Sequence, residues 1–215
     1  MKHSGFNAIM ADAQDMIRRH GFALPPFADW TPEEFSQNAG RARHVIDAHR
    51  GSDITDYAVG DLDAVGFLPF TLRNGLPEDQ HASSGMCCAE KLLISRQGRL
   101  SSMHTHVLKS VDITNRGGAT LGVELYRSDD TGAFGDDRGG IRHDNAPGES
   151  LTPRPDNGHA FWGEGDDVLI GKTSTANDDE TDNIFRDRIG RFSTIAEDTA
   201  PGHLLVSNAK TWLAA

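Results

Sequence analysis

The residues with the clearest potential for chemistry are three histidines in strand-like segments. His104 and His106 are separated by one residue, and His159 follows a Pro-Asp-Asn-Gly sequence much later in the chain. Because successive side chains of a strand point to opposite faces, His104 and His106 would project from the same face. A third imidazole from a distant segment can complete three corners of a site for a divalent ion. The spacing therefore predicts a metal centre formed by His104, His106 and His159.

The competing interpretation is that these histidines are ordinary packed or surface residues. The chain has 10 histidines, so one closely spaced pair is not by itself unusual. His159, however, lies between a turn sequence and the aromatic pair Phe161-Trp162, a layout typical of a ligand at the mouth of a small β-barrel. The other seven are interpreted as packed or surface residues: His3, His20, His44, His49, His81, His143 and His203.

The first fifty residues are expected to form helices. Apolar residues recur at helical spacing from Phe6 to Ile17, and Gly21 provides a stop signal. Thr31 is a candidate N-cap with Pro32 at the first helical position. The second helix is predicted to run from there to about His49.

After Gly51 the pattern changes to short apolar runs separated by Gly, Pro, Asn and Asp. Many short strands with frequent turns predict an all-β sandwich or barrel. The expected strands include residues 66–72, 89–95, 119–126 and 167–171. The sequence Asn-Arg-Gly-Gly at 115–118 is read as a tight hairpin turn.

Composition limits the partners and the compartment. A net charge of −11 over 215 residues disfavours nucleic acid and anionic membranes, so a neutral small molecule is the expected ligand. The two cysteines, Cys87 and Cys88, are adjacent, which argues against a disulfide framework and for a reducing, cytoplasmic location. The acidic segment 174–183 is read by composition as a solvated loop, with contact to a polar ligand as the alternative.

Several short sequence motifs, which follow one another in a fixed order along the chain, resemble those of a known family of sugar isomerases. They include Trp-Thr-Pro-Glu at 30–33, Thr-Leu-Arg-Asn-Gly at 71–75, Met-His-x-His-x-x-Lys at 103–109 and Asn-Arg-Gly-Gly at 115–118. Later phrases are His-x-Phe-Trp at 159–162, Thr-Asp-Asn-x-Phe at 181–185 and Ile-Gly-Arg-Phe at 189–192. Together they cover most of the chain and resemble the D-lyxose isomerase family.

The resemblance implies a mainly β, cupin-type jelly-roll barrel over residues 51–215, with residues 1–50 as a helical segment packed on it. It further implies a homodimer and one divalent ion, most often manganese, with zinc, cobalt or iron as alternatives. The implied reaction converts D-lyxose to D-xylulose, and D-mannose to D-fructose as a side activity, by proton transfer through a metal-stabilised enediolate.

Site residues follow from the same resemblance. The three histidines are the implied metal ligands. Lys109 is the family's motif lysine and is expected to transfer a proton or stabilise an oxygen. Glu197 is the favoured base, with Asp198 as the alternative. The expected substrate contacts are Asp182, Arg191 and Phe161.

Two positions depart from the family pattern. Val111 occupies the place of a glutamate ligand, and Lys172 stands where the family commonly has glutamate, which would change the charge of the pocket. Asp112 could replace the missing ligand through a β-bulge, or three histidines and water could suffice. The alternative function is a cupin sugar-binding protein, or an orphan lyase or epimerase, that lost isomerase chemistry through Val111.

Overall fold

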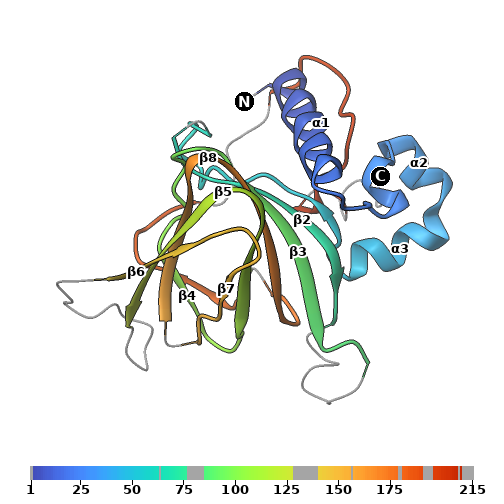
Figure 1. Cartoon of the computed structure of the whole chain (residues 1–215). Helices are drawn as coiled ribbons and strands as arrows, with labels where there is room; N and C mark the ends of the chain where they lie inside the picture. The colour runs from blue at the N-terminus through green and yellow to red at the C-terminus, as the bar shows by residue number, and fades with distance from the viewer. Residues whose placement is uncertain are drawn as a thin grey trace.

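A computed structural model describes residues 2–62, 64–76, 85–127, 140–155, 157–178, 181–190, 196–207 and 209. Within them α1 to α3 precede Gly51, and the strands form one curved antiparallel sheet (Figure 1). Figure 1 shows α1 at one end of the β-structure and α2 with α3 at its side. The mainly β, cupin-like fold with an N-terminal helical segment is therefore confirmed. No helix among the described residues is long and apolar enough to cross a membrane.

The first helix, α1 (His3–Arg19), presents one apolar face to the sheet. Its buried apolar side chains are Phe6, Met10, Ala13, Met16 and Ile17. They pack in one cluster with sheet residues such as Leu92, Ile94 and Leu169. The apolar residues that recur at helical spacing in the sequence are therefore the ones that α1 buries in this cluster.

The second predicted helix begins as expected but is divided in two. A short 3-10 helix, η1 (Pro26–Asp29), precedes α2 (Pro32–Gln37) and α3 (Ala39–Asp47). Thr31 caps α2, because its hydroxyl accepts from the Glu34 amide and the Glu34 carboxylate accepts from the Thr31 amide. The break falls at Asn38, whose side-chain amide donates to the Glu34 carbonyl at 2.8 Å. The same carbonyl also accepts from the Asn38 backbone amide at 3.0 Å, and Asn38 itself has φ −100° and ψ 27°, outside the helical conformation.

The β-structure is organised around its longest strand. Its strands are β1 (Gly51–Ser52), β2 (Leu68–Asn74), β3 (Cys88–Ser95), β4 (His104–His106), β5 (Val111–Arg127), β6 (Ile141–Asn145), β7 (Ser150–Leu151), β8 (Asn157–Thr175) and β9 (Asn183–Phe185). The order is β1-β2-β3-β8-β4-β9, and β5 pairs with β6, β7 and β8. On one side β8 pairs with β5; on the other its start pairs with β4 and its end with β3. This arrangement brings segments far apart in sequence to the two ends of β8.

The prediction of a hairpin turn at residues 115–118 is wrong, because these residues lie inside β5. The register of β5 against β8 shifts between Asn115 and Gly117 and again between Gly118 and Thr120. Gly118 has φ +97°, and a Cβ there would come within 2.2 Å of the Asp167 carbonyl oxygen. Glycine is favoured at positive φ both in tight turns and in β-bulges, so the two adjacent glycines in the sequence could not distinguish a turn from a bulge.

A second apolar cluster occupies the concave interior of the sheet. Its buried members are Leu93, Val111, Ile113, Leu121, Val123, Phe161, Val168 and Ile170. Val111 and Ile113 are two residues apart in β5 and share this inward face. The cluster fills the interior beside the segments that carry the three histidines.

Candidate metal centre and adjoining cavity

The three predicted histidines come together at the start of β8. His104 and His106 lie on β4, and His159 lies directly opposite His104 in the antiparallel pair of β4 and β8. One ring nitrogen from each histidine lies within 4.8 Å of the other two. The side chains are almost fully buried, at 7%, 2% and 1% exposure for His104, His106 and His159. The structure therefore places three imidazoles where one ion could contact all of them.

The hydrogen bonds of the rings leave nitrogen atoms available toward the common centre. His104 Nδ1 lies 2.8 Å from the Ser102 carbonyl oxygen, and His159 Nδ1 lies 3.2 Å from that of Asn157. A neutral ring that donates from Nδ1 keeps its lone pair on Nε2. Among the described residues, His159 Nε2 and both nitrogens of His106 are buried without a hydrogen-bond partner. Buried polar atoms are rarely left so, and a metal ion would bind His159 Nε2 and one of the two nitrogens of His106.

Electrostatics keep the three rings neutral. Burial lowers the pKa of His159 to about 3 and lowers the pKa of His104 well below its usual value. Burial also lowers the pKa of His106 far below its usual value, with further contributions from the positive charges of Lys172 and Lys109. A neutral imidazole is the form that binds a metal. The donor set therefore fits a divalent ion that accepts nitrogen ligands.

Lys109 and Asp182, two of the residues expected at the site, lie beside the histidines. Lys109 is 1% exposed, and its ammonium donates to Asn177 Oδ1 at 2.8 Å. Asp182 Oδ2 lies 3.8 Å from Lys109 Nζ and 4.0 Å from His106 Nδ1. Asp182 Oδ1 accepts from the Leu108 amide at 2.7 Å. One carboxylate thus links the lysine to the histidine group.

The residues that contact the Lys109 ammonium belong to the acidic segment 174–183, which composition predicted to be a solvated loop. Asn177 and Asp182 are both buried, at 5% and 7% exposure. Asn74 holds the backbone of Asn177 from both sides: its amide donates to the Asn177 carbonyl, and its oxygen accepts from the Asn177 amide. The segment therefore contacts the site through residues that secure the buried lysine.

A cavity of about 240 Å³ opens next to His104. Aromatic rings of Tyr57, Phe67, Phe161 and Phe185 form part of its wall. Neighbouring rings stack edge to face or tilted, with Phe67 and Phe161 centroids 5.5 Å apart and Tyr57 and Phe185 centroids 5.8 Å apart. Such a wall can contact the carbon face of a small polar ligand and exclude water. Phe161, one of the expected substrate contacts, lines this cavity.

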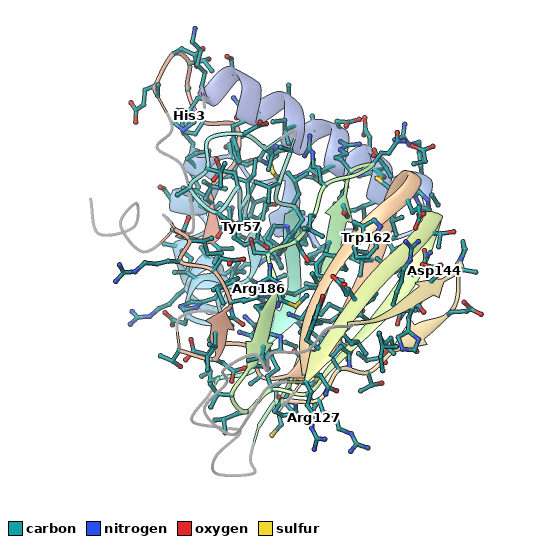
Figure 2. All side chains as sticks on the ribbon, turned by 90° about the vertical axis from the view of Figure 1, so that its left-hand side faces the viewer. His3, Tyr57, Arg127, Asp144, Trp162 and Arg186 are labelled. Atoms are coloured by element: carbon teal, nitrogen blue, oxygen red, sulfur yellow. The ribbon has the colours of Figure 1, made fainter. Side chains whose placement is uncertain are left out.

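Tyr57 connects this wall to the histidine group. Figure 2 shows Tyr57 within the body of the molecule, and its side chain is 4% exposed. Burial raises the pKa of its hydroxyl, which hydrogen-bonds to Ser102. Ser102 also provides the carbonyl that contacts His104 Nδ1. The backbone at Tyr57 has φ 54°, an unfavourable conformation for a bulky residue, and such strain is found most often at functional sites.

The structure does not bring Asp112 to the histidines. Its carboxylate accepts hydrogen bonds from Thr114 Oγ1 at 3.1 Å and Thr152 Oγ1 at 2.9 Å. The bulges of β5 begin after Asn115, so no extra residue turns Asp112 inward. Val111 keeps the inward position and is 0% exposed in the apolar cluster. The interpretation of Asp112 as a replacement ligand therefore has no support in this geometry.

The structure does not place Glu197 or Asp198 in the lining of the cavity. Both are exposed, and Asp198 accepts from the Ser4 amide and hydroxyl at the start of α1. The adjoining Ala196 carbonyl accepts from the His3 amide, and Figure 2 shows His3 at the upper edge of the molecule, away from Tyr57. Neither carboxylate lines the cavity. Arg191, the remaining predicted contact, lies outside the described residues.

Several cavity residues were not singled out from the sequence. His49, which was read as a packed or surface residue, lines the cavity, as do Tyr57 and Lys91. A usable signal existed for Lys91, because it is a charged residue two positions from Leu93 in an apolar strand and so shares its inward face. Lys172, noted from sequence only as a change of pocket charge, lines the same cavity.

Comparison with known proteins gives a consistent result. A family model described as D-lyxose isomerase matches residues 1–209. A D-lyxose/D-mannose isomerase of Serratia proteamaculans is 37% identical over 221 residues, which cover 95% of this chain and 96% of the relative. A protein of the same name from Escherichia coli O157:H7 is 34% identical over 228 residues, with 97% of each chain covered.

Solved structures support the fold at much lower sequence identity. An L-ribose isomerase of Acinetobacter sp. DL28, in complex with L-ribose, superposes with a TM-score of 0.63 at 12% identity. An L-ribose isomerase of Cellulomonas parahominis with L-ribose gives a TM-score of 0.59 at 13% identity. In both cases the match covers 91% of this chain and 98% of the other. At this identity the likeness concerns the architecture of the chain.

Proposed function

This chain belongs to the D-lyxose isomerase family and is a sugar isomerase, and we propose that it interconverts D-lyxose and D-xylulose in a metal-dependent reaction, with D-mannose and D-fructose as a slower pair. The observation that carries the metal dependence is the group of three buried, neutral histidines beside the cavity. Both relatives named for D-lyxose and D-mannose match nearly the whole chain, which supports the choice of sugars.

The metal that we propose is one Mn²⁺ ion, held by His104, His106 and His159. When bound, the ion would polarise the sugar carbonyl and stabilise the negative charge of the enediolate. Three protein ligands with open positions are the usual arrangement of catalytic metal sites. The Ser102 and Asn157 carbonyls hold the rings of His104 and His159 in the tautomer that the site needs.

The protein's own groups would orient the sugar and handle its protons. The Phe161 and Phe185 rings would contact the carbon face of the open-chain sugar. Lys109 would hold or deliver a proton at a sugar oxygen, since Asn177 and Asp182 fix its ammonium group beside the histidines. The ammonium would also stabilise oxygen charge as it develops, and burial strengthens that interaction.

Metal removal tests this function directly. We expect turnover of D-lyxose to fall by more than about 100-fold after treatment with a chelator and to return when Mn²⁺ is added. The measurement is ketose formation from D-lyxose and D-mannose, with circular dichroism to verify that the chelated protein stays folded. A folded, manganese-loaded protein without turnover on either sugar would contradict the proposal.

Val111 is the one observation that favours the alternative, a cupin that binds sugar or catalyses a lyase or epimerase reaction after losing isomerase chemistry. It contributes an apolar side chain, 0% exposed, where the family resemblance implies a glutamate ligand. If the chain is a working isomerase, the three histidines must suffice without that carboxylate.

Val111→Glu separates the two functions. In the metal-free protein we expect a loss of more than about 2 kcal/mol in unfolding free energy, because a carboxylate replaces a packed apolar group. Under the proposed function, wild-type turnover is substantial and the variant does not raise it 100-fold. A rise from near zero to robust turnover would favour the alternative. Val111→Gln is the matched control, with similar size and no charge; metal titration and chemical denaturation are the measurements.

A further inference from the structure

The phenol ring of Tyr57 is fixed in the wall of the cavity by other aromatic rings. It meets the rings of Phe67 and Phe185 edge to face, at centroid distances of 6.2 and 5.8 Å. The Phe185 ring in turn lies 5.5 Å from the ring of His104. Because Tyr57 is also buried, these contacts hold its ring in one orientation beside the histidine group.

The hydroxyl of Tyr57 is held by one residue, Ser102. Both the backbone amide and the side chain of Ser102 hydrogen-bond to it. Burial raises the pKa of the hydroxyl, while these two bonds lower that pKa, which is the effect of donors to the phenol oxygen. The carbonyl oxygen of the same Ser102 lies 2.8 Å from His104 Nδ1. A continuous series of hydrogen bonds therefore runs from Tyr57 through Ser102 to His104.

The backbone at Tyr57 is held in an unfavourable conformation. Tyr57 and Ala58 have φ values of 54° and 61°, in the left-handed region that residues other than glycine seldom occupy. The Asp56 carboxylate accepts from the amides of Ala58 and Gly60 at 3.0 and 3.2 Å. The Tyr57 carbonyl accepts from the Gly190 amide at 3.1 Å. Such a conformation persists only where surrounding contacts enforce it, and it is found most often at functional sites.

We propose that Tyr57 is a positioning residue for the metal ligand His104 and that it acts through Ser102. Its hydroxyl holds Ser102 so that the Ser102 carbonyl stays directed at His104 Nδ1. That contact keeps the proton of the neutral ring on Nδ1 and the lone pair on Nε2, where a metal ion needs it. The inference rests on the proposed function, because it concerns the metal centre of the same site.

Tyr57→Phe tests this role, because it removes the hydroxyl and keeps the ring in the wall of the cavity. We expect the dissociation constant for Mn²⁺ to rise by about 10-fold, the lower end of the range for residues that support a metal ligand. Titration of the metal-free protein with Mn²⁺ measures this change. The KM for D-lyxose at saturating Mn²⁺ should change much less, because the ring still contacts the cavity.

A second measurement requires neither metal nor turnover. In metal-free protein with isotope-labelled histidine, nitrogen–proton correlation spectra show which ring nitrogen of His104 carries the proton, and a His104→Gln variant identifies its signals. The wild type should be protonated at Nδ1, and Tyr57→Phe should increase the fraction protonated at Nε2. The proposal requires both the weaker binding of Mn²⁺ and the shift of the proton, and the absence of either change overturns it.

Tyr126→Phe is the matched control, because Tyr126 is the other tyrosine of the chain. Its hydroxyl donates to Glu124 at 3.0 Å, and it is not part of the cavity lining. The control should leave the Mn²⁺ affinity and the His104 proton unchanged. Ser102→Ala tests the route: its effect on Mn²⁺ affinity and that of Tyr57→Phe should add to less than their sum in the double variant. Fully additive effects would contradict a route through Ser102.

The remaining outcomes separate this inference from the proposed function. Weaker binding of D-lyxose with unchanged Mn²⁺ affinity would make the hydroxyl a substrate contact and overturn the positioning role. A lower melting temperature with unchanged Mn²⁺ affinity would reduce Tyr57 to a structural residue, and the metal centre would stand. A wild type that binds no Mn²⁺ would contradict the metal centre itself, and the proton of His104 would then decide alone whether Tyr57 positions that ring.

Discussion

His159→Ala is expected to lower metal affinity by more than about 100-fold and to abolish measurable turnover of D-lyxose. Replacing a residue that only supports a metal ligand typically costs 10- to 100-fold, so removal of a ligand should cost more. His159 is 1% exposed, and its ring centroid lies 4.3 Å from that of His104 and 5.2 Å from that of His106. Asp182 Oδ2 lies 4.0 Å from His106 Nδ1, but the described group whose ligand atoms all lie within 4.8 Å of one another comprises the three histidines without it.

The measurement is manganese content per chain after dialysis, together with ketose formation at saturating Mn²⁺. His143→Ala is the matched control, because His143 lies on β6 outside the histidine group and should keep both metal and turnover. Circular dichroism checks that each variant is folded. A His159→Ala protein that retained one tightly bound ion would contradict the three-histidine centre.

The histidines could be predicted because their signal is local and periodic. The alternation of β4 fixes a common face for His104 and His106, and the turn before β8 sets the position of His159. Pairing of His104 with His159 then follows from the antiparallel sheet. The strands of the β-structure and the start of α2 were predicted for the same reason, since they depend on alternation and capping.

The positions of Glu197 and Asp198 could not be predicted from a local pattern, because they depend on the path of the loops. Glu197 and Asp198 follow β9, and the chain there runs to the start of α1, where Asp198 contacts Ser4. By contrast, Asn177 and Asp182 lie at the site although they belong to an acidic segment that composition predicts to be exposed to solvent. Long-range contacts with Lys109, Asn74 and Leu108 make that segment part of the site. Tertiary contacts of this kind leave no periodic pattern in the sequence.

Lys109→Met is expected to lower turnover of D-lyxose by about 10²- to 10⁴-fold, the range typical for a group that transfers protons. The variant should also unfold about 3–5 kcal/mol more easily, because it leaves the Asp182 carboxylate buried without its cationic neighbour 3.8 Å away. Loss of activity alone would therefore not distinguish a proton-transfer group from a residue that only balances charge.

The double variant Lys109→Met/Asp182→Asn separates these two roles. Removing both charges should restore most of the lost stability, because a neutral pair of similar volume no longer buries an uncompensated charge. If Lys109 handles a proton of the reaction, turnover stays low in the double variant although the fold and the manganese content recover. If its role is charge balance, turnover returns together with stability. Urea denaturation, metal content and initial rates on D-lyxose are the measurements, and Lys2→Met is the matched control for loss of a lysine.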